Sequence, residues 1–239
     1  MGKYVIDEAT LTAIGDSIRE KENTTAAVPV TEMAERIAAI TAAEDKSTLT
    51  AVGNTELSEI EESAYENHQT LRMVNYPNVR TVGKNAFRGA RALQIVSLTG
   101  AATISSNAFY CCTALESVEL PNAVTIDQNA FKDCVNLTEI ELPKAMYTEY
   151  SAFSGCTNLR TVKFGRSGKI GLSAFSGCTA LSEVDFSQCG TVMTLSGDAA
   201  TSVFKDVPST CQYKVPSGLL ASWKSQSKWA SVASQIVGV

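Results

Sequence analysis

The stretch AFYCCTALESVELP, residues 108–121, contains the pattern that decides the fold. Its alanine-aromatic pair recurs at an unbroken 22-residue spacing, and a fixed period of this size is the signature of a solenoid. The pairs are Ala64-Tyr65, Ala86-Phe87, Ala108-Phe109, Ala130-Phe131, Ala152-Phe153 and Ala174-Phe175, and the leucines that follow them are Leu71, Leu93, Leu115, Leu137, Leu159 and Leu181. The pattern therefore predicts six consecutive copies of one unit.

Each leucine opens a run in which apolar and polar residues alternate, as in Leu115-Glu116-Ser117-Val118-Glu119-Leu120. A period of two is typical of a strand with one buried face, and one unit cannot bury that face alone. Stacking in parallel register places equivalent side chains about 4.7–4.9 Å apart along the axis. We expect an α/β repeat fold with parallel strands on one face and short helical turns, formed by the alanine-aromatic step, on the other.

The third residue after each aromatic completes the repeat: His68, Ala90, Cys112, Cys134, Cys156 and Cys178. Because alanine serves at the same position, we interpret these cysteines as reduced, buried thiols and His68 as a packing residue. Cys111 and Cys189 are the thiols expected to be most exposed. Zinc is a poor alternative, since 22-residue spacings differ from the short paired loops of a zinc site.

The chain divides into three parts by pattern. Residues 1–45 predict a helical hairpin, residues 46–216 hold the six 22-residue units and a degenerate seventh, and residues 217–239 predict a capping helix. The hairpin rests on apolar residues at helical spacing: Ile6, Leu11, Ile14, Ile18, Met33, Ile37 and Ile40. Its small area predicts that it packs on the solenoid end, self-associates or docks on another protein.

The period breaks after Phe175, because the next aromatic anchor, Phe204, comes seven residues late. We therefore interpret 185–201 as a loop inserted in the seventh repeat. Beyond it, Ser217 is a candidate N-cap for the capping helix. Its apolar positions are Leu219, Leu220, Trp223, Trp229, Val232 and Ile236.

Composition excludes several classes of function. The formal net charge is −5, no basic patch is interleaved with aromatics, and no apolar run approaches the roughly 18–20 residues that span a membrane. Glycine-rich phosphate loops and a serine-histidine-acid arrangement are also missing from the sequence, so we expect neither cofactor nor metal, nucleic acid nor membrane insertion.

The outward columns of the strand face are the natural binding surface of a solenoid. The candidate binding residues are Arg72, Asn75, Glu116, Glu119, Glu139, Glu141, Arg160, Lys163, Glu183 and Asp185. The central outward column contains Met73, Ile95, Ser117, Glu139, Thr161 and Glu183. The glutamates of two adjacent repeats form either a solvated face that discourages aggregation or a patch for a basic partner or a cation.

The pattern A-F-x-x-C-x-x-L-x-x-V-x-L-P over residues 59–216 resembles the BspA-like leucine-rich repeats. The segments Leu11-Thr-Ala-Ile-Gly-Asp-Ser-Ile-Arg-Glu-Lys and Val30-Thr-Glu-Met-Ala-Glu-Arg-Ile resemble an N-terminal segment of phage and prophage tail or fibre proteins. The first resemblance implies a leucine-rich-repeat solenoid that adheres to a surface and has no enzyme activity.

Two functions follow from these resemblances. The first is a receptor-binding or fibre component of a phage tail, located in the virion, with residues 1–45 attached to other tail or particle proteins; the absence of an apolar leader favours it. The second is a secreted bacterial adhesin at the cell surface. Either would bind a protein or glycan receptor, and a homo-oligomer is left open. A remote third is a glycan-acting enzyme that uses Glu119 or Glu141.

Overall fold

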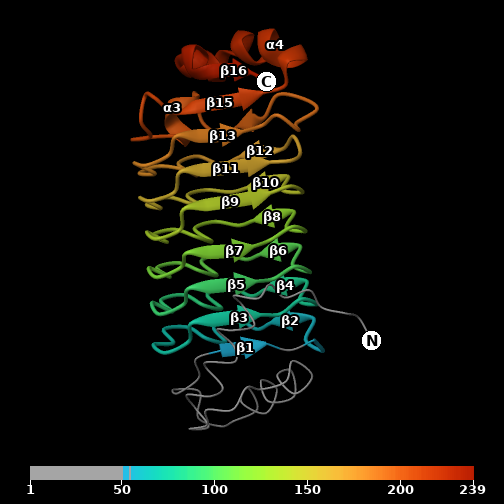
Figure 1. Ribbon diagram of the computed structural model, residues 1–239, viewed down its shortest axis with the longest axis vertical. Helices are drawn as coiled ribbons and strands as arrows, with labels where there is room; N and C mark the ends of the chain where they lie inside the picture. The colour runs from blue at the N-terminus through green and yellow to red at the C-terminus, as the bar shows by residue number, and fades with distance from the viewer. Residues whose placement is uncertain (1–50, 54) are drawn as a thin grey trace, which may run out of the picture.

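The computed structural model describes residues 51–53 and 55–239. Over these residues the chain forms a straight stack of coils, with one repeat per level and the C-terminal elements at one end (Figure 1). The predicted hairpin of residues 1–45 lies outside the described residues. The first strand of the solenoid is β1 (Ala51–Gly53).

One face of the stack, called the front face below, carries the strands that follow each leucine. They form a four-stranded parallel sheet and a five-stranded parallel sheet, which follow one another along the axis. The first contains β1, β3 (Met73–Asn75), β5 (Ile95–Ser97) and β7 (Ser117–Glu119); the second contains β9 (Glu139–Leu142), β11 (Thr161–Phe164), β13 (Glu183–Asp185), β15 (Gln212–Val215) and β16 (Ile236–Gly238). Met73 pairs with Ile95 and Val162 with Val184, so the register is one 22-residue repeat.

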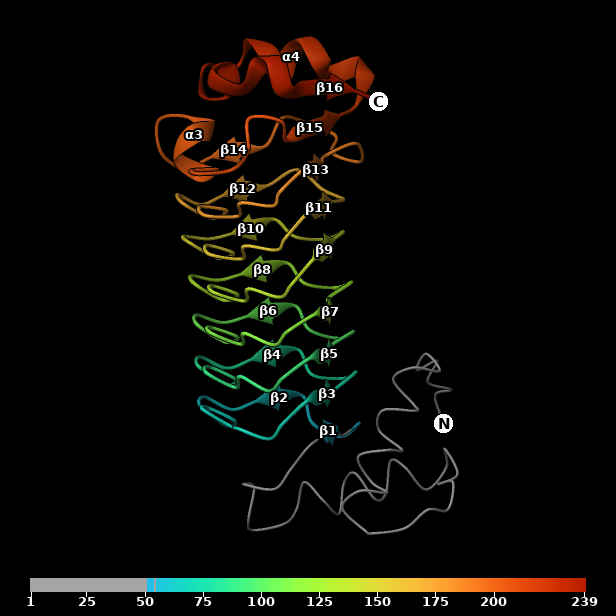
Figure 2. The ribbon, with the colours of Figure 1, turned by 60° about the vertical axis from the view of Figure 1, so that its left-hand side comes forward.

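The second face of the stack is a sheet that the sequence analysis missed. Seven two-residue strands pair in parallel beside the front face (Figure 2). They are β2 (Glu59–Ile60), β4 (Thr81–Val82), β6 (Thr103–Ile104), β8 (Thr125–Ile126), β10 (Tyr147–Thr148), β12 (Lys169–Ile170) and β14 (Thr194–Leu195). Each ends on a buried side chain, which in β4 is Val82 and in β6 is Ile104.

The alanine-aromatic step, predicted as a short helical turn, forms a turn that does not continue into a helix. Two residues of each such segment have left-handed backbones, as at Asn85 (φ 57°) and Gly89 (φ 70°), and these interrupt any helix. The amides then alternate between partners. Ala90 N–H donates to Phe87 O at 3.0 Å within the turn, whereas Phe87 N–H donates to Ala108 O at 2.7 Å in the next repeat. The turns therefore join successive repeats as the strands do.

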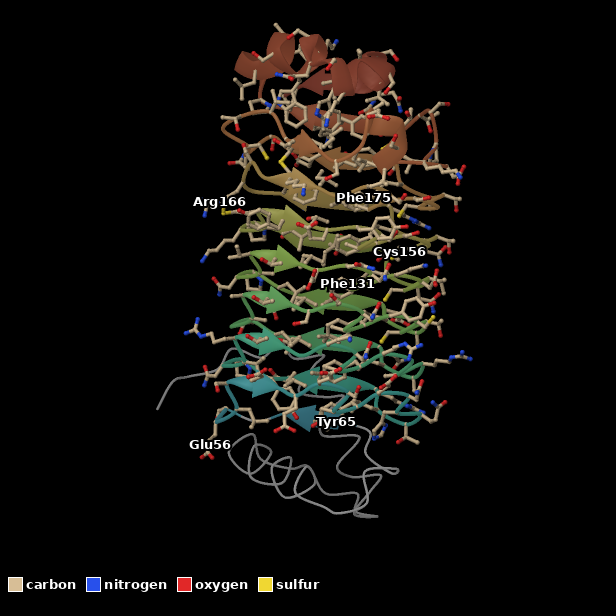
Figure 3. The ribbon with its side chains drawn as sticks, turned by 180° about the vertical axis from the view of Figure 1, so that it is seen from behind. Glu56, Tyr65, Phe131, Cys156, Arg166 and Phe175 are labelled. Carbon is tan, nitrogen blue, oxygen red and sulfur yellow. The ribbon has the colours of Figure 1, made fainter. Side chains whose placement is uncertain are left out.

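The aromatic residues stack through the core as predicted. Adjacent rings from Tyr65 to Phe175 lie 5.0–5.4 Å apart between centroids and within 7° of parallel. Figure 3 shows Tyr65, Phe131 and Phe175 at three levels along the axis of the stack. Aromatic pairs at this separation stabilise the fold beyond the effect of burying their area.

The repeated cysteines also lie where the sequence placed them. Cys112, Cys134, Cys156 and Cys178 are free thiols with no exposed surface. Each Sγ donates to the carbonyl of the aromatic residue one repeat earlier, at 3.1 Å for Cys134 to Phe109. Burial raises the pKa of the Cys178 thiol to about 12. A small residue that satisfies a buried carbonyl explains why cysteine suits this position.

An asparagine column runs along the left-handed position before the alanine-aromatic pair. Asn107 Nδ2 donates to Asn85 Oδ1 at 3.2 Å, and Asn129 Nδ2 donates to Asn107 Oδ1 at 3.2 Å. The column ends at Asn129, whose Oδ1 is buried without a partner, because the next repeat has Ser151 there.

The seventh repeat absorbs its extra residues in two places. Lys169 pairs with Thr194, where the regular register would give Thr191. Glu183 pairs with Gln212, where the regular register would give Lys205. Part of the insertion therefore precedes β14 and the rest follows it.

The aromatic column continues across this insertion. Phe204 stacks on Phe175, at 5.4 Å between centroids and 7° between planes. The segment 185–201 is not a simple loop, since it contains β14 and the start of helix α3 (Ala200–Val203). The seventh repeat thus keeps its core position and its two strands.

The C-terminal segment 217–239 caps the stack with several short elements rather than one helix. They are a 3₁₀ helix (Ser217–Leu219), α4 (Leu220–Ser225), a 3₁₀ helix (Ser227–Gln235) and β16, which pairs with β15. Ser217 makes no N-cap bond; its Oγ donates to Val239 O at 3.0 Å. Trp223 and Trp229 are buried beside Phe186, and they close the core at this end.

Truncating one ring should show how far the aromatic stack stabilises the fold. Phe131 contacts Phe109 and Phe153 on its two faces, so Phe131→Ala removes both contacts and leaves a cavity. We expect the free energy of unfolding to fall by about 3–5 kcal/mol, measured by urea denaturation. Gln128→Ala, at an exposed position of the same repeat, is the control and should change it by less than about 0.5 kcal/mol. A loss for Phe131→Ala no larger than that of the control would contradict the stacked core.

Extending the asparagine column should stabilise the protein. Ser151 is left-handed (φ 54°), and Ser151→Asn would supply an amide to the unpartnered Asn129 Oδ1. We expect a gain of about 0.5–1.5 kcal/mol in the free energy of unfolding. Ser173→Asn is the matched control, because it has the same backbone (φ 57°) but follows a serine in the column. Equal gains in the two variants would show that backbone preference, and not the hydrogen bond, is responsible.

Candidate binding surface

The front face presents three outward columns of side chains, because alternate residues of each strand point away from the core. All ten predicted binding residues lie on it, and none is buried. Those that are exposed are Arg72, Glu116, Glu119, Glu139, Glu141, Arg160 and Lys163, and those that are half-buried are Asn75, Glu183 and Asp185. The structure therefore brings the predicted residues together on one surface.

Two ion pairs lie on the part of the front face from β9 to β15. Lys163 Nζ lies 2.6 Å from Glu141 Oε1, and Lys214 Nζ lies 2.7 Å from Glu183 Oε2. The hydrogen bond to Glu141 raises the pKa of Lys163, and the bond to Glu183 raises the pKa of Lys214. Both lysines are exposed enough that solvent screens the attraction strongly. Glu141 on β9 and Glu183 on β13 are thus each paired with a lysine of the next strand.

Three glutamates remain outside these pairs, and we call them the acidic zone: Glu116, Glu119 and Glu139. Glu119 accepts a hydrogen bond from Ser97 Oγ at 2.8 Å, and no ion pair to the three carboxylates forms within residues 51–53 and 55–239. They lie on or directly before β7 and β9, which are neighbouring strands of the front face (Figure 1). The zone is a compact group of exposed negative charges.

For two residues, the position on the front face differs from what the sequence predicted. Lys214 was missed because the insertion moves it out of the 22-residue register; it pairs with Asp185, where the regular register would place Val207. Met73 was expected on the exposed central column but is only 3% exposed. The late position of Phe204 is the signal that could have located Lys214.

The residues with catalytic or metal-binding potential are engaged in structure. His68 Nδ1 accepts a hydrogen bond from Leu71 N–H at 3.1 Å, and the side chain is half-buried at the cysteine position. In the described part of the chain, no three histidine, cysteine or carboxylate side chains gather as metal ligands would. No helix in that part has the length and hydropathy to cross a membrane.

Of the two thiols expected to be most exposed, Cys111 and Cys189, one is buried. Cys111 is half-buried, and its Sγ lies 3.9 Å from Asp133 Oδ2. Cys189, expected to be exposed, is 1% exposed, because it occupies the repeat position at which Val79, Ala101, Ala123 and Ala145 are buried; burial raises its pKa to about 11.

Comparison with known proteins agrees with this architecture. The family model "BspA type Leucine rich repeat region" matches residues 102–202, in six copies. Over this range the repeats are similar to leucine-rich repeats of the BspA type. No curated protein matches the chain.

Solved structures extend the comparison. A leucine-rich repeat protein from T. pallidum superposes with a TM-score of 0.55 and 23% identity, over 66% of this chain and 78% of that one. This likeness shows the fold. The pneumococcal vaccine antigen PcpA (TM-score 0.38, 15% identity, 82% and 72% covered) and an internalin from Listeria monocytogenes (0.34, 9%, 95% and 74%) are more distant. A phage-tail role gains no support from these matches.

Thiol reactivity should separate Cys111 from the six other cysteines. At pH 8 in native protein, we expect a disulfide reagent that releases a chromophore to modify one thiol rapidly, because the other six are buried and react as thiolates only slowly. All seven should react in denaturant. Cys111→Ser should abolish the rapid phase, and rapid reaction of two or more thiols in the native protein would contradict the buried column.

Proposed function

We propose that this chain is a non-enzymatic binding protein that uses its front face to hold a protein partner outside the cell or at the cell surface. The observation that supports it is the acidic zone, where Glu116, Glu119 and Glu139 are exposed together and free of ion pairs to described residues. The leucine-rich-repeat character of the stack is consistent with this role.

The construction of the front face suits binding more than chemistry. Its backbone groups are paired along parallel strands, so the outward side chains are the part that can vary without loss of the fold. Like charges on adjacent strands destabilise a sheet by a few tenths of a kcal/mol each. Such a group is tolerated most easily where a partner compensates it.

The chemistry of the acidic zone indicates a basic partner surface. Exposed carboxylates on adjacent strands create a local negative potential that attracts lysine- or arginine-bearing surfaces and speeds their association. Arg160 and Lys163 limit the zone on the side of β11, so the recognised patch would be small and centred on β7 and β9.

A glycan-acting enzyme has less support. Glu119 and Glu141 are both exposed, and their carboxylates bind Ser97 and Lys163 respectively. Both carboxylates are therefore engaged with other side chains of the strand face.

A charge-reversal experiment tests the proposal. Glu116→Lys, Glu119→Lys and Glu139→Lys are combined, and binding to immobilised extracellular-matrix proteins and to intact epithelial cells is measured at two salt concentrations. We expect at least a tenfold loss of binding, and a weaker wild-type interaction at the higher salt concentration because screening reduces the attraction. Protease and glycosidase treatment of the probe then distinguishes a protein ligand from a glycan.

The matched control carries the same change of charge away from the front face. Glu61→Lys, Glu149→Lys and Asp198→Lys lie outside the front strands, and we expect binding within twofold of wild type. Equal binding by the two triple variants, or failure of the wild type to bind either probe, would overturn the proposal.

A further inference from the structure

An apolar strip interrupts the polar front face at its N-terminal end. Ala51, Met73 and Ile95 are equivalent residues of β1, β3 and β5, and they pair in register. Their neighbours Val52 and Val74 point into the core, and side chains alternate along a strand. The three residues of the strip therefore face outward.

The burial of this strip does not come from the core. Ala51 and Met73 are 9% and 3% exposed, and Ile95 is half-buried. However, the cluster of side chains that forms the core contains Val52 and Val74 but neither Ala51 nor Met73. Apolar residues on the outward side of a sheet mark a surface suited to a covering contact.

The repeat itself does not require apolar residues here. The same column continues with Ser117 in β7 and Glu139 in β9, which are exposed, and with Thr161 and Glu183. The fold thus tolerates polar side chains at this position in later repeats. The apolar residues are confined to the three strands that the chain enters first.

The segment that precedes Ala51 in the sequence is the expected occupant of the strip. Ala51 is both the first residue of the strip and the residue at which the preceding chain enters the solenoid. Fifty residues precede it, and residues 4–42 have apolar side chains at helical spacing, including Leu11, Ile14 and Ile37. The strip is about 10 Å across at the spacing of parallel strands, which this segment can reach without a long connection.

We propose that the strip of Ala51, Met73 and Ile95 is the docking surface for the chain's own N-terminal segment, residues 4–42. The apolar side of that segment buries the strip, and its attachment to Ala51 makes the contact intramolecular. This inference stands apart from the proposed function, because it concerns strands that do not carry the acidic zone.

Hydrogen exchange on the full chain tests the docking. Met73→Glu places a charge in the strip, whereas Ser117→Glu makes the same change of charge two strands later in the same column, and serves as the control. We expect amides within residues 4–42 to exchange at least tenfold faster in Met73→Glu than in wild type, and at the wild-type rate in Ser117→Glu. Unfolding by urea, followed by Trp223 and Trp229 fluorescence, reports whether the solenoid stays folded in each variant.

Several outcomes would overturn the proposal. Unchanged exchange in Met73→Glu, or exchange of residues 4–42 at the unprotected rate in wild type, would remove the segment from the strip. If Met73→Glu unfolds the solenoid, Met73→Ala with Ile95→Ala is measured in its place, and the same faster exchange is expected. A loss of protection that coincides with a change from dimer to monomer in sedimentation would assign the strip to a second copy. Binding of the matrix and cell probes is not expected to change in Met73→Glu, so the two proposals fail separately.

Discussion

Parallel pairing between repeats in a 22-residue register is the constraint on which the rest of this structure depends. It operates at the front strands, at the two-residue strands of the second sheet and in the turns, where Phe87 N–H reaches Ala108 O. Each repeat thus satisfies the buried backbone groups of its neighbour, and an unpaired group would cost roughly 1–3 kcal/mol. A single repeat is not stable without its neighbours, so the free energy of unfolding depends on the whole stack.

The same constraint explains why identical residue types recur at identical positions. Successive repeats lie one strand spacing apart along the axis, so each side chain contacts the equivalent side chains of the two neighbouring repeats. Phe131 therefore contacts two phenylalanines, and Asn107 contacts two asparagines. Columns of like residues are favourable for rings, amides and thiols. Columns of like charge are not, which is why the glutamates of β7 and β9 stand out from the pairs that Lys163 and Lys214 make beside them.

The sequence predicted the features that follow from periodicity and missed those that do not. The aromatic, leucine and cysteine columns and the outward positions of the strand face were predicted because one period places them all. The second sheet was missed because strands of two residues, such as Thr103–Ile104, are too short to show alternation. The left-handed positions have a signal in retrospect, in the asparagine, serine and glycine that flank each alanine-aromatic pair. Lys214 was misjudged because the insertion changes the register, and no pattern within the repeat records where the extra residues go. Cys189 was misjudged although it keeps the 22-residue spacing of a buried position, that of Ala123 and Ala145.

The departures from the period are therefore the informative part of the molecule. A repeat needs only its inward residues, so an outward residue that changes character between levels reflects something outside the repeat. Two such changes occur on the front face: the central column is apolar through Ile95 and polar from Ser117, and the free carboxylates begin at Glu116. They meet at the boundary between β5 and β7. A stack that is uniform inside thus has an outer face of two parts, the first suited to an apolar contact and the second to a basic one.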